Sequence, residues 1–230
     1  MITSAQRLGK AQDHLLTLID GHMLHPLAAR AFEEMKEAAS RDGITLAIAS
    51  GFRSFDRQLL IWNRKWSGER SVNDEQGHPL NTTQLSDEEK LHAILYWSAL
   101  PGASRHHWGT DIDVWDPSRF NSNQTLQLVP EEYEHINAPC YPLLCWLQQH
   151  AHEFGFFFPY RVYQGGVSHE PWHLSYQPVA DHIQQSLTLD ELKNALSNTD
   201  IAGKETVLAH LHVIKERYFD NICRSNTGEE

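Results

Sequence analysis

The order of hydrophobic patterns along the chain constrains its fold more than any other feature. Apolar residues recur at helical spacing in residues 4–19 and 26–41, which predicts two amphipathic helices. The short apolar run ITLAIAS, residues 44–50, then predicts a buried strand, and residues 55–66 predict another helix. Because these elements follow one another without regular strand–helix–strand alternation, we expect an α+β fold with a small, mainly antiparallel sheet flanked by helices.

Polar stretches alternate with short regular elements in the middle of the chain. Residues 67–88 are rich in Ser, Asn, Asp, Gly, Thr and Gln, which predicts a long surface loop of the kind that borders functional sites. Two strands, 156–163 and 171–176, are predicted to form a hairpin through Gln164-Gly165-Gly166. The other segments expected here are a helix over DEEKLHAILYWSA, a strand over 109–115, an irregular stretch at 117–139 and a helix over 142–154.

The end of the chain carries helical patterns without a chemical motif. They are LDELKNAL and ETVLAHLHVIKERYFDNI, and no internal repeat accompanies them. We therefore predict one main domain over residues 1–180 and a C-terminal helical extension, residues 181–230, packed on the same domain.

Charge and cysteine content exclude several classes of function. The 19 Lys and Arg residues face 30 Asp and Glu, giving a formal net charge of −11. Nucleic-acid binding through counterion release needs clustered cations, so this balance argues against a nucleic-acid partner. The three cysteines have no CxxC spacing, so neither a disulfide framework nor a structural zinc ribbon is expected; they are Cys140, Cys145 and Cys223.

The N-terminal stretch bears on location. It lacks the basic segment, apolar run and cleavage site of a secretory signal, and no apolar run of about 18 residues implies a membrane span. We expect a cytoplasmic protein from the chain as written, or a periplasmic or extracellular one if a leader has been removed.

The stretch SRHHWGTDIDVWD, residues 104–116, raises the question of a metal site. His106 precedes a turn at Gly109, and Asp113 lies on the strand that follows, so the two side chains converge if the chain doubles back. Two ligands alone are weak evidence, because a catalytic zinc ion usually has three protein ligands and leaves a fourth position for water.

Two further motifs supply the remaining parts of such a site. In HEPWHLSY, residues 169–176, His173 can bind the metal while Glu170 stays unligated and accepts a proton from water. In SGFRSFDRQ, residues 50–58, Arg53 follows the end of a buried strand and can reach an anionic substrate group or a developing oxyanion.

In order and spacing, SGFRSxxxQ, SRHHWGTDID and EPWH resemble the motifs of the zinc D-alanyl-D-alanine carboxypeptidase and dipeptidase family, which includes the vancomycin-resistance peptidases and the LAS group. The match covers roughly residues 44 to 176. It implies the fold of that family, the hedgehog/DD-peptidase fold, in which helices flank a small antiparallel sheet. It also implies peptidoglycan-derived peptides as substrates.

The resemblance also implies a role for each matched residue. The ligands of one zinc ion are then His106, Asp113 and His173. Glu170 is the general base, and Arg53 stabilises the transition state. The substrate contacts are Ser104 and Gln58. His107 and His169 fall outside the ligand positions, so we expect them to be solvent-exposed or to lie behind the ligands.

The chain departs from the family pattern at three places. Asp111 stands where the family usually has a small apolar residue, and as a neighbour of Asp113 on one strand face it either orients a ligand or adds charge to the pocket. Trp108 replaces a smaller residue, and the helical tail lies outside the family core. Pocket size and specificity therefore stay open.

From these motifs we expect a zinc metallocarboxypeptidase that removes the terminal residue from a D-Ala-D-Ala-type stem peptide. A D,D-dipeptidase, an L,D-carboxypeptidase and an L-alanyl-D-glutamate-type endopeptidase of the same family share the metal site, and no motif decides among them. A zinc-binding module without catalysis is the alternative from another class. The presence of both Glu170 and Arg53 argues against it, since binding alone needs neither.

Overall fold

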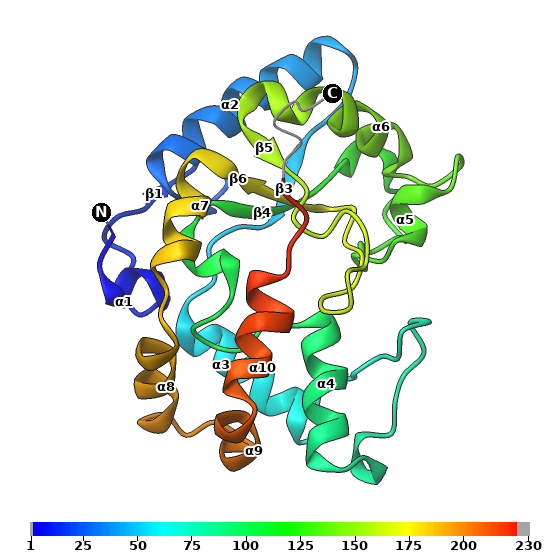
Figure 1. Ribbon diagram of the computed structural model, residues 1–230. Coiled ribbons are helices and arrows are strands. Elements are labelled where there is room, and N and C mark those ends of the chain that lie inside the picture. The colour runs from blue at the N-terminus through cyan, green and yellow to red at the C-terminus, as the bar shows by residue number, and fades with distance from the viewer. Residues whose placement is uncertain (1, 225–230) are drawn as a thin grey trace.

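A four-stranded antiparallel sheet lies at the centre of the molecule, with the strand order β3-β4-β6-β5 (Figure 1). Its strands are β3 (Ala47–Ser50), β4 (Asp111–Trp115), β5 (Phe156–Phe157) and β6 (His173–Tyr176). This computed structural model describes residues 2–224. The predicted α+β class with a small antiparallel sheet is confirmed.

One face of the sheet is apolar and packs against two helices. Ile112 and Val114 of β4 and Leu174 of β6 are fully buried among side chains of α2 (Pro26–Arg41) and α6 (Tyr141–His150). Both helices lie on the same side of the sheet in Figure 1. Because successive side chains of a strand point to opposite faces, the residues between these apolar positions must face the other way.

The other face of the sheet is polar. It carries four buried side chains that alternate with the apolar ones, and these are Asp111, Asp113, His173 and Ser175. Buried polar groups are stable only when they are hydrogen-bonded or charge-paired. The strand pattern therefore places a polar network inside the protein, on the side away from α2 and α6.

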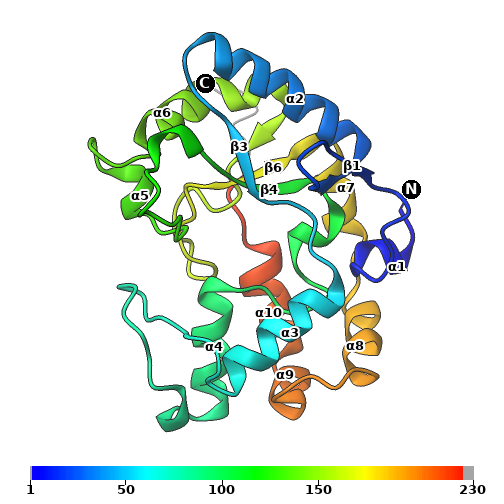
Figure 2. The ribbon, with the colours of Figure 1, turned by 180° about the vertical axis from the view of Figure 1, so that it is seen from behind.

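Helices from both halves of the chain form a second core below the sheet. α3 (Phe55–Trp66) and α4 (Asp87–Trp97) pack with the C-terminal helices in one apolar cluster (Figure 2). The C-terminal elements are α7 (Gln177–Ser186), α8 (Leu189–Ser197), α9 (Lys204–Ala209), α10 (Leu211–Ile214) and the π-helical turn η5 (Lys215–Asp220).

The tail is joined to this core by specific contacts as well as by burial. The indole N–H of Trp62 donates to the carbonyl of Ala202 at 3.0 Å. The ring of Phe219 meets that of Trp108 edge-on, with 5.8 Å between centroids. α7 runs across the predicted boundary between the main domain, residues 1–180, and the extension, residues 181–230.

The predicted helix over residues 4–19 is wrong beyond its first turn. α1 spans only Ser4–Arg7, and β1 (Leu16–Thr17) pairs with β2 (Met23–Leu24). The chain leaves the helix at Gly9, which has a φ of +73°. Ile19, part of the apparent apolar stripe, is 100% exposed, so a helix here would have no core against which to bury that face.

The predicted hairpin is also wrong, although its two strands do pair. β5 contains two residues, and Phe156 and Phe157 pair with Tyr176 and Ser175. Pro159 follows closely and cannot donate to a ladder. A long loop therefore connects the strands, and its Gln164-Gly165 carbonyls accept hydrogen bonds from Asn221 and Arg217 of the C-terminal segment.

Short turns and loops complete the chain. The segment predicted as a loop at 67–88 is irregular up to α4, apart from short turns and an isolated β-bridge between Asn73 and Pro79. The short elements are η1 (Thr82–Gln84), η2 (Arg105–Trp108), η3 (Pro117–Arg119), α5 (Glu131–Glu134) and η4 (Ala151–Phe154). Among the described residues, no helix combines the length and apolar character needed to cross a membrane.

Candidate active site

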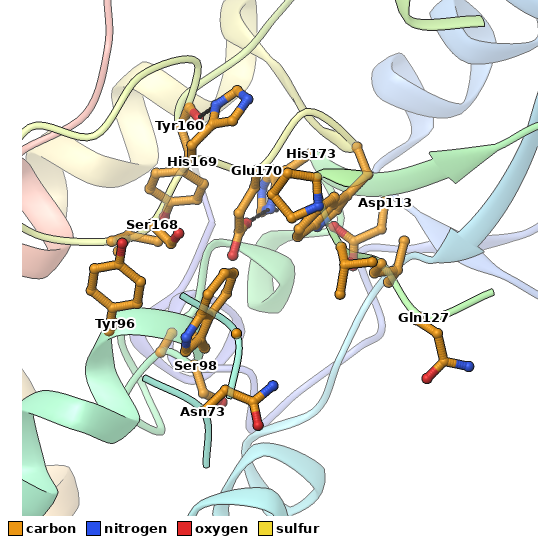
Figure 3. Close-up of a pocket in the computed structure, with 18 of the residues that line it drawn as sticks. Asn73, Tyr96, Ser98, Asp113, Gln127, Tyr160, Ser168, His169, Glu170 and His173 are labelled. Carbon is orange, nitrogen blue, oxygen red and sulfur yellow. Dashed lines mark hydrogen bonds and ion pairs between the residues drawn. The ribbon is translucent and has the colours of Figure 1, made fainter. Parts of the chain in front are cut away.

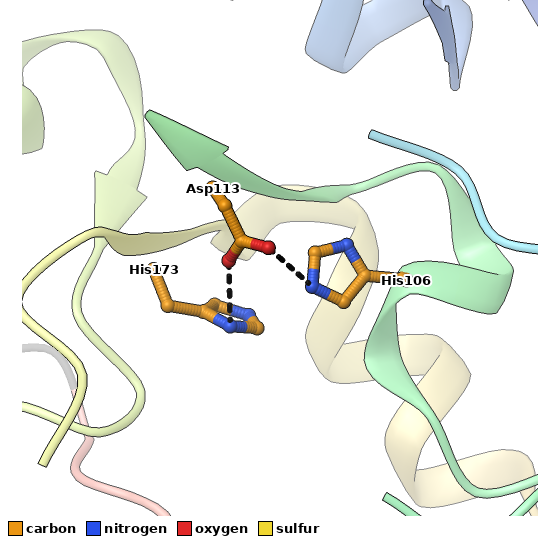
Figure 4. A group of neighbouring side chains, drawn as sticks. All are labelled: His106, Asp113 and His173. Carbon is orange, nitrogen blue, oxygen red and sulfur yellow. Dashed lines mark ion pairs between the residues drawn. The ribbon is translucent and has the colours of Figure 1, made fainter. Parts of the chain in front are cut away.

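Three of the predicted residues meet on the polar face of the sheet (Figure 4). Asp113 of β4 and His173 of β6 are direct cross-strand partners, so the register of the sheet places them side by side. His106 comes from η2, which precedes β4 and ends at Gly109 with a φ of +68°. This turn folds the chain back so that His106 faces Asp113.

The distances in this group suit a shared cation. Asp113 Oδ2 lies 3.5 Å from His106 Nε2, and Asp113 Oδ1 lies 3.4 Å from His173 Nδ1. One ligand atom from each residue lies within 4.8 Å of the others. Asp113 Oδ1 is buried and accepts no hydrogen bond. No hydrogen-bond donor occupies this buried oxygen, which lies beside two imidazole nitrogens. A carboxylate oxygen and imidazole nitrogens are ligands that a zinc ion prefers.

Each histidine is oriented by a partner on its far side. His106 Nδ1 donates to the carbonyl of Gly51 at 2.9 Å, which leaves Nε2 free to bind a metal. His173 Nε2 lies 3.1 Å from Asp111 Oδ1 and donates to it, because a carboxylate oxygen only accepts. His173 Nδ1 is then the nitrogen that faces Asp113.

The carboxylates around His173 stabilise positive charge at this position. Burial acts to lower the pKa of His173, but its hydrogen bonds to Asp111 and Glu170 and the charge of Asp113 raise the pKa to about 10. The carboxylates therefore stabilise positive charge here strongly enough to overcome the cost of burial.

Asp111 belongs to a buried network that the sequence did not reveal. Arg105, with 2% of its surface exposed, donates through Nε to Asp111 Oδ1 at 2.7 Å. Its other nitrogens donate to Ser175 Oγ at 2.7 Å and to Gln184 Oε1 at 2.6 Å. Burial alone would raise the pKa of Asp111, but Arg105 and His173 hold it well below the usual range. Asp111 is thus ionised, its charge is balanced by Arg105, and it accepts the hydrogen bond that orients His173.

Glu170 and Arg53 lie next to the three residues. Glu170 Oε2 is 3.1 Å from His173 Nδ1, and Arg53 Nη2 is 4.0 Å from Asp113 Oδ2. Arg53 is held by hydrogen bonds to Gln58 Oε1 at 3.0 Å and Ser50 Oγ at 3.1 Å. Burial lowers the pKa of Arg53, while the charges of Asp113 and Glu170 oppose that shift.

These side chains line a cavity of about 560 Å³ (Figure 3). Several residues of the loop between 70 and 77 border it, as expected for the segment 67–88, together with aromatic side chains such as Tyr96 and Tyr160. Ser104 lines the cavity as well. Gln58 is fully buried and its amide holds Arg53 and the carbonyl of Ala99, so its predicted contact with substrate stays a prediction.

Of the two expectations for the neighbouring histidines, solvent exposure does not hold for His107. His107 is fully buried; its Nδ1 donates to the carbonyl of Arg53 at 2.6 Å, and its Nε2 accepts from the amide of Gly102 at 3.0 Å. Burial lowers the pKa of His107 to about 3, so the ring is neutral. His169 lines the cavity and contacts Glu134 at 2.8 Å.

Comparison with known proteins places this site in a family. The family model of VanY, described as D-alanyl-D-alanine carboxypeptidase, matches residues 21–179, a range that contains all seven predicted site residues. This chain belongs to the VanY family. The resemblance carried by the three motifs is thereby confirmed.

Individual proteins and solved structures are also similar to this chain. An uncharacterised protein of Haemophilus influenzae is 43% identical over 103 residues, which cover 43% of this chain and 70% of that protein. The structure of VanYB in complex with D-alanine-D-alanine has a TM-score of 0.52 at 24% identity, covering 78% of this chain and 87% of that one. That of the LdcB LD-carboxypeptidase has a TM-score of 0.54 at 24% identity, covering 80% and 78%. These two structures share the fold.

Proposed function

We propose that this VanY-family protein is a zinc-dependent metallopeptidase that removes the terminal D-amino acid from peptidoglycan stem peptides. The observation that carries the proposal is the meeting of His106, Asp113 and His173 at one end of a cavity, with Glu170 and Arg53 beside them. A metal site, a proton acceptor and a cation for a developing negative charge are the parts that peptide hydrolysis requires.

The residues that would hold zinc are His106 through Nε2, His173 through Nδ1 and Asp113 through its carboxylate. Bound there, zinc supplies a Lewis acid that acidifies water and polarises the peptide carbonyl. The hydrogen bonds from His106 to Gly51 and from His173 to Asp111 orient the two rings so that the ligating nitrogens face Asp113.

Glu170 is the general base of the proposed reaction. Its carboxylate is 3.1 Å from His173 and faces the cavity, where it takes a proton from the attacking water and passes it to the leaving amine. Arg53 stabilises the negative charge that develops on the carbonyl oxygen. The peptide bond breaks, water is added across it, and a free D-amino acid leaves.

Other members of the same reaction class remain alternatives. A D,D-dipeptidase, an L,D-carboxypeptidase or an L-alanyl-D-glutamate-type endopeptidase would use the same zinc ligands and the same base. The fold does not separate them, since it is shared with VanYB and with an LD-carboxypeptidase. A zinc module without catalysis is disfavoured because Glu170 and Arg53 both line the cavity.

The test combines metal analysis with turnover on a panel of stem peptides. We expect about one zinc per chain and release of D-alanine from tetrapeptide or pentapeptide stems or from free D-Ala-D-Ala, abolished by a chelator. Glu170→Gln should keep its zinc and lose at least about 100-fold in kcat, because a positioned general base contributes about 10² to 10⁴. Glu37→Gln, on the exposed side of α2, is the control.

Each result has a definite meaning. Unchanged turnover in Glu170→Gln would remove Glu170 as the base. Zinc without hydrolysis of any stem would favour the non-catalytic module, and absence of zinc would reject the assigned site.

A further inference from the structure

Two tyrosines form a wall of the cavity away from the metal ligands. Tyr96, near the end of α4, and Tyr163, in the loop between β5 and β6, both line the cavity, and their ring centroids are 5.5 Å apart. In Figure 3, Tyr96 lies on the opposite side of the cavity from Asp113. Tyr163 keeps 45% of its surface exposed. Neither ring has a part in the proposed reaction, and exposed aromatic rings in a cavity are surfaces that a ligand can cover.

The loop that carries Tyr163 is held by residues 217–223, which run beside it near the end of the chain (Figure 1). Three carbonyls around Tyr163 accept hydrogen bonds from this segment: that of Val162 from Cys223 Sγ, that of Gln164 from Asn221 Nδ2 and that of Gly165 from Arg217 Nε. These bonds fix the backbone on both sides of Tyr163. They therefore also fix the direction in which its side chain leaves the loop.

Close backbone packing adds to these hydrogen bonds. A Cβ on Gly166 would collide with the carbonyl oxygen of Arg217, so only glycine lets the loop approach the segment this closely. At the start of the loop, the amide of Cys223 donates to the carbonyl of Pro159 at 2.8 Å. The contacts with residues 217–223 therefore extend along the loop from Pro159 to Gly166.

The same segment contacts the helix that carries Tyr96. Tyr218 is only 7% exposed, its hydroxyl lies 2.8 Å from His92 Nδ1 on α4, and the two rings are stacked with 5.8 Å between centroids. His92 and Tyr96 are four residues apart, which places them on one side of the helix. The amide of Ser168 donates to the carbonyl of Tyr96 at 2.9 Å and joins the loop to α4 directly. Residues 217–223 thus contact both parts of the wall.

The wall and the segment that holds it differ in their relation to the family. The loop and α4 fall within residues 21–179, which the family model matches, and residues 217–223 fall outside that range. A part of this chain beyond the matched range therefore positions a wall of the cavity within it.

We propose that residues 217–223 determine specificity for substrate length, by holding Tyr163 beside Tyr96 as a subsite for the part of the peptide on the amino side of the cleaved bond. This inference rests on the proposed function and deepens it, since removal of a terminal residue leaves the rest of the peptide on that side. Tyrosine rings present apolar faces to aliphatic side chains and the peptide backbone, and their hydroxyls form hydrogen bonds. A longer peptide therefore gains contacts that a short one cannot reach.

The test compares two N-acetylated peptides that end in the same bond, D-Ala-D-Ala as the short one and L-Ala-D-Glu-L-Lys-D-Ala-D-Ala as the long one. We expect zinc-loaded wild-type protein to have the lower KM for the long peptide. Tyr163→Ala should raise that KM about 10-fold and leave kcat and the KM of the short peptide unchanged, while Tyr163→Phe, which keeps the ring, should stay close to wild type. Val162→Ala is the control, because Val162 is 52% exposed and borders a different hollow.

Asn221→Ala tests the positioning role of the segment. Among residues 2–224, those that line the cavity do not include Asn221, so its effect must pass through the carbonyl of Gln164. We expect the KM of the long peptide to rise about 3-fold, with kcat, zinc content and the KM of the short peptide unchanged. Asn198→Ala removes a hydrogen bond of the same kind, from Asn198 to the carbonyl of Asn194 at the end of α8, and serves as the control.

Several results would overturn the inference. Equal KM values for the two peptides in wild-type protein, or an equal change for both in Tyr163→Ala, would reject the subsite. A higher KM in Tyr163→Ala with none in Asn221→Ala would reject the role of residues 217–223. Zinc content and the urea midpoint of each variant report whether it is folded.

Calorimetry separates this inference from the proposed function, because it measures the affinity for both peptides without turnover in zinc-loaded Glu170→Gln protein. Preference for the long peptide that is lost in Tyr163→Ala, in a protein whose wild type hydrolyses neither peptide, would support the inference and contradict the proposed function. Hydrolysis by wild-type protein without any preference for length would contradict the inference alone.

Discussion

At the scale of single residues, Asp111 separates this chain most clearly from the family pattern. A small apolar residue at that position would leave His173 Nε2 without a partner from β4. Here the carboxylate accepts from Nε2 at 3.1 Å and is itself neutralised by Arg105. The extra charge therefore supports a ligand and does not reach the substrate as free negative charge.

Asp111→Asn should weaken zinc binding by about 10- to 100-fold. Loss of the carboxylate behind His173 lowers the basicity of that histidine and leaves its ring less firmly oriented. The dissociation constant of zinc is measured by competition with a chelator. Asp116→Asn removes a buried carboxylate at the end of the same strand, away from His173, and serves as the control. An unchanged zinc affinity in Asp111→Asn would show that Asp111 is only a structural partner of Arg105.

The sequence identified the residues that carry chemistry better than the residues that support them. His106, Asp113, His173 and Glu170 stand in motifs whose spacing is itself informative. Arg105 has no role in the motifs, and an arginine is usually solvent-exposed. The burial of Arg105 and His107 depends on contacts with α7 and with the chain before β2, which a local pattern cannot show.

At the scale of elements, the turn at Gly109 sets the geometry of the site. A Cβ at Gly109 would lie 2.6 Å from Leu15 Cδ2 and 2.8 Å from the backbone nitrogen of His25, and the φ of +68° disfavours any side chain. Gly109→Ala should therefore destabilise the protein by about 2 kcal/mol or more. It should also weaken zinc binding by shifting His106 relative to Asp113.

Gly43→Ala distinguishes backbone strain from steric clash in this experiment. Gly43 has a φ of +79°, and a Cβ there would meet nothing within 4 Å, so only the backbone penalty of about 1 kcal/mol applies. Urea denaturation gives both stabilities. Equal losses in the two variants would contradict the role assigned to the close contact.

Element boundaries were predictable where a local signal decided them and unpredictable where packing did. The helix expected over 55–66 has those bounds, with Ser54 accepting a hydrogen bond at its start. The apolar spacing over 4–19 imitates a helix, yet Gly9 packs against His107, and the chain turns there to let β1 pair with β2. The contact between Gly9 and His107 joins distant parts of the sequence, which periodicity does not report.

At the scale of the whole molecule, the tail and the site share one support. Gln184 of α7 accepts from Arg105 and donates to the carbonyl of Phe219 at 3.2 Å. The Phe219 ring also packs on Trp108, two residues after His106. The C-terminal segment therefore contacts both the part of the chain that carries His106 and the hydrogen-bond network that orients His173.

Phe219→Ala tests whether the tail and the site unfold together. The side chain is almost fully buried, so its removal should cost about 3 to 5 kcal/mol and lower the urea midpoint of a single transition. Val213→Ala, on an exposed position of α10, should change stability by less than about 0.5 kcal/mol. Tryptophan fluorescence and zinc release are followed on the same samples. If Phe219→Ala produced an early transition with zinc still bound, the tail would be a separate folding unit; coincident curves would show that the tail is part of the structure that holds the metal ligands.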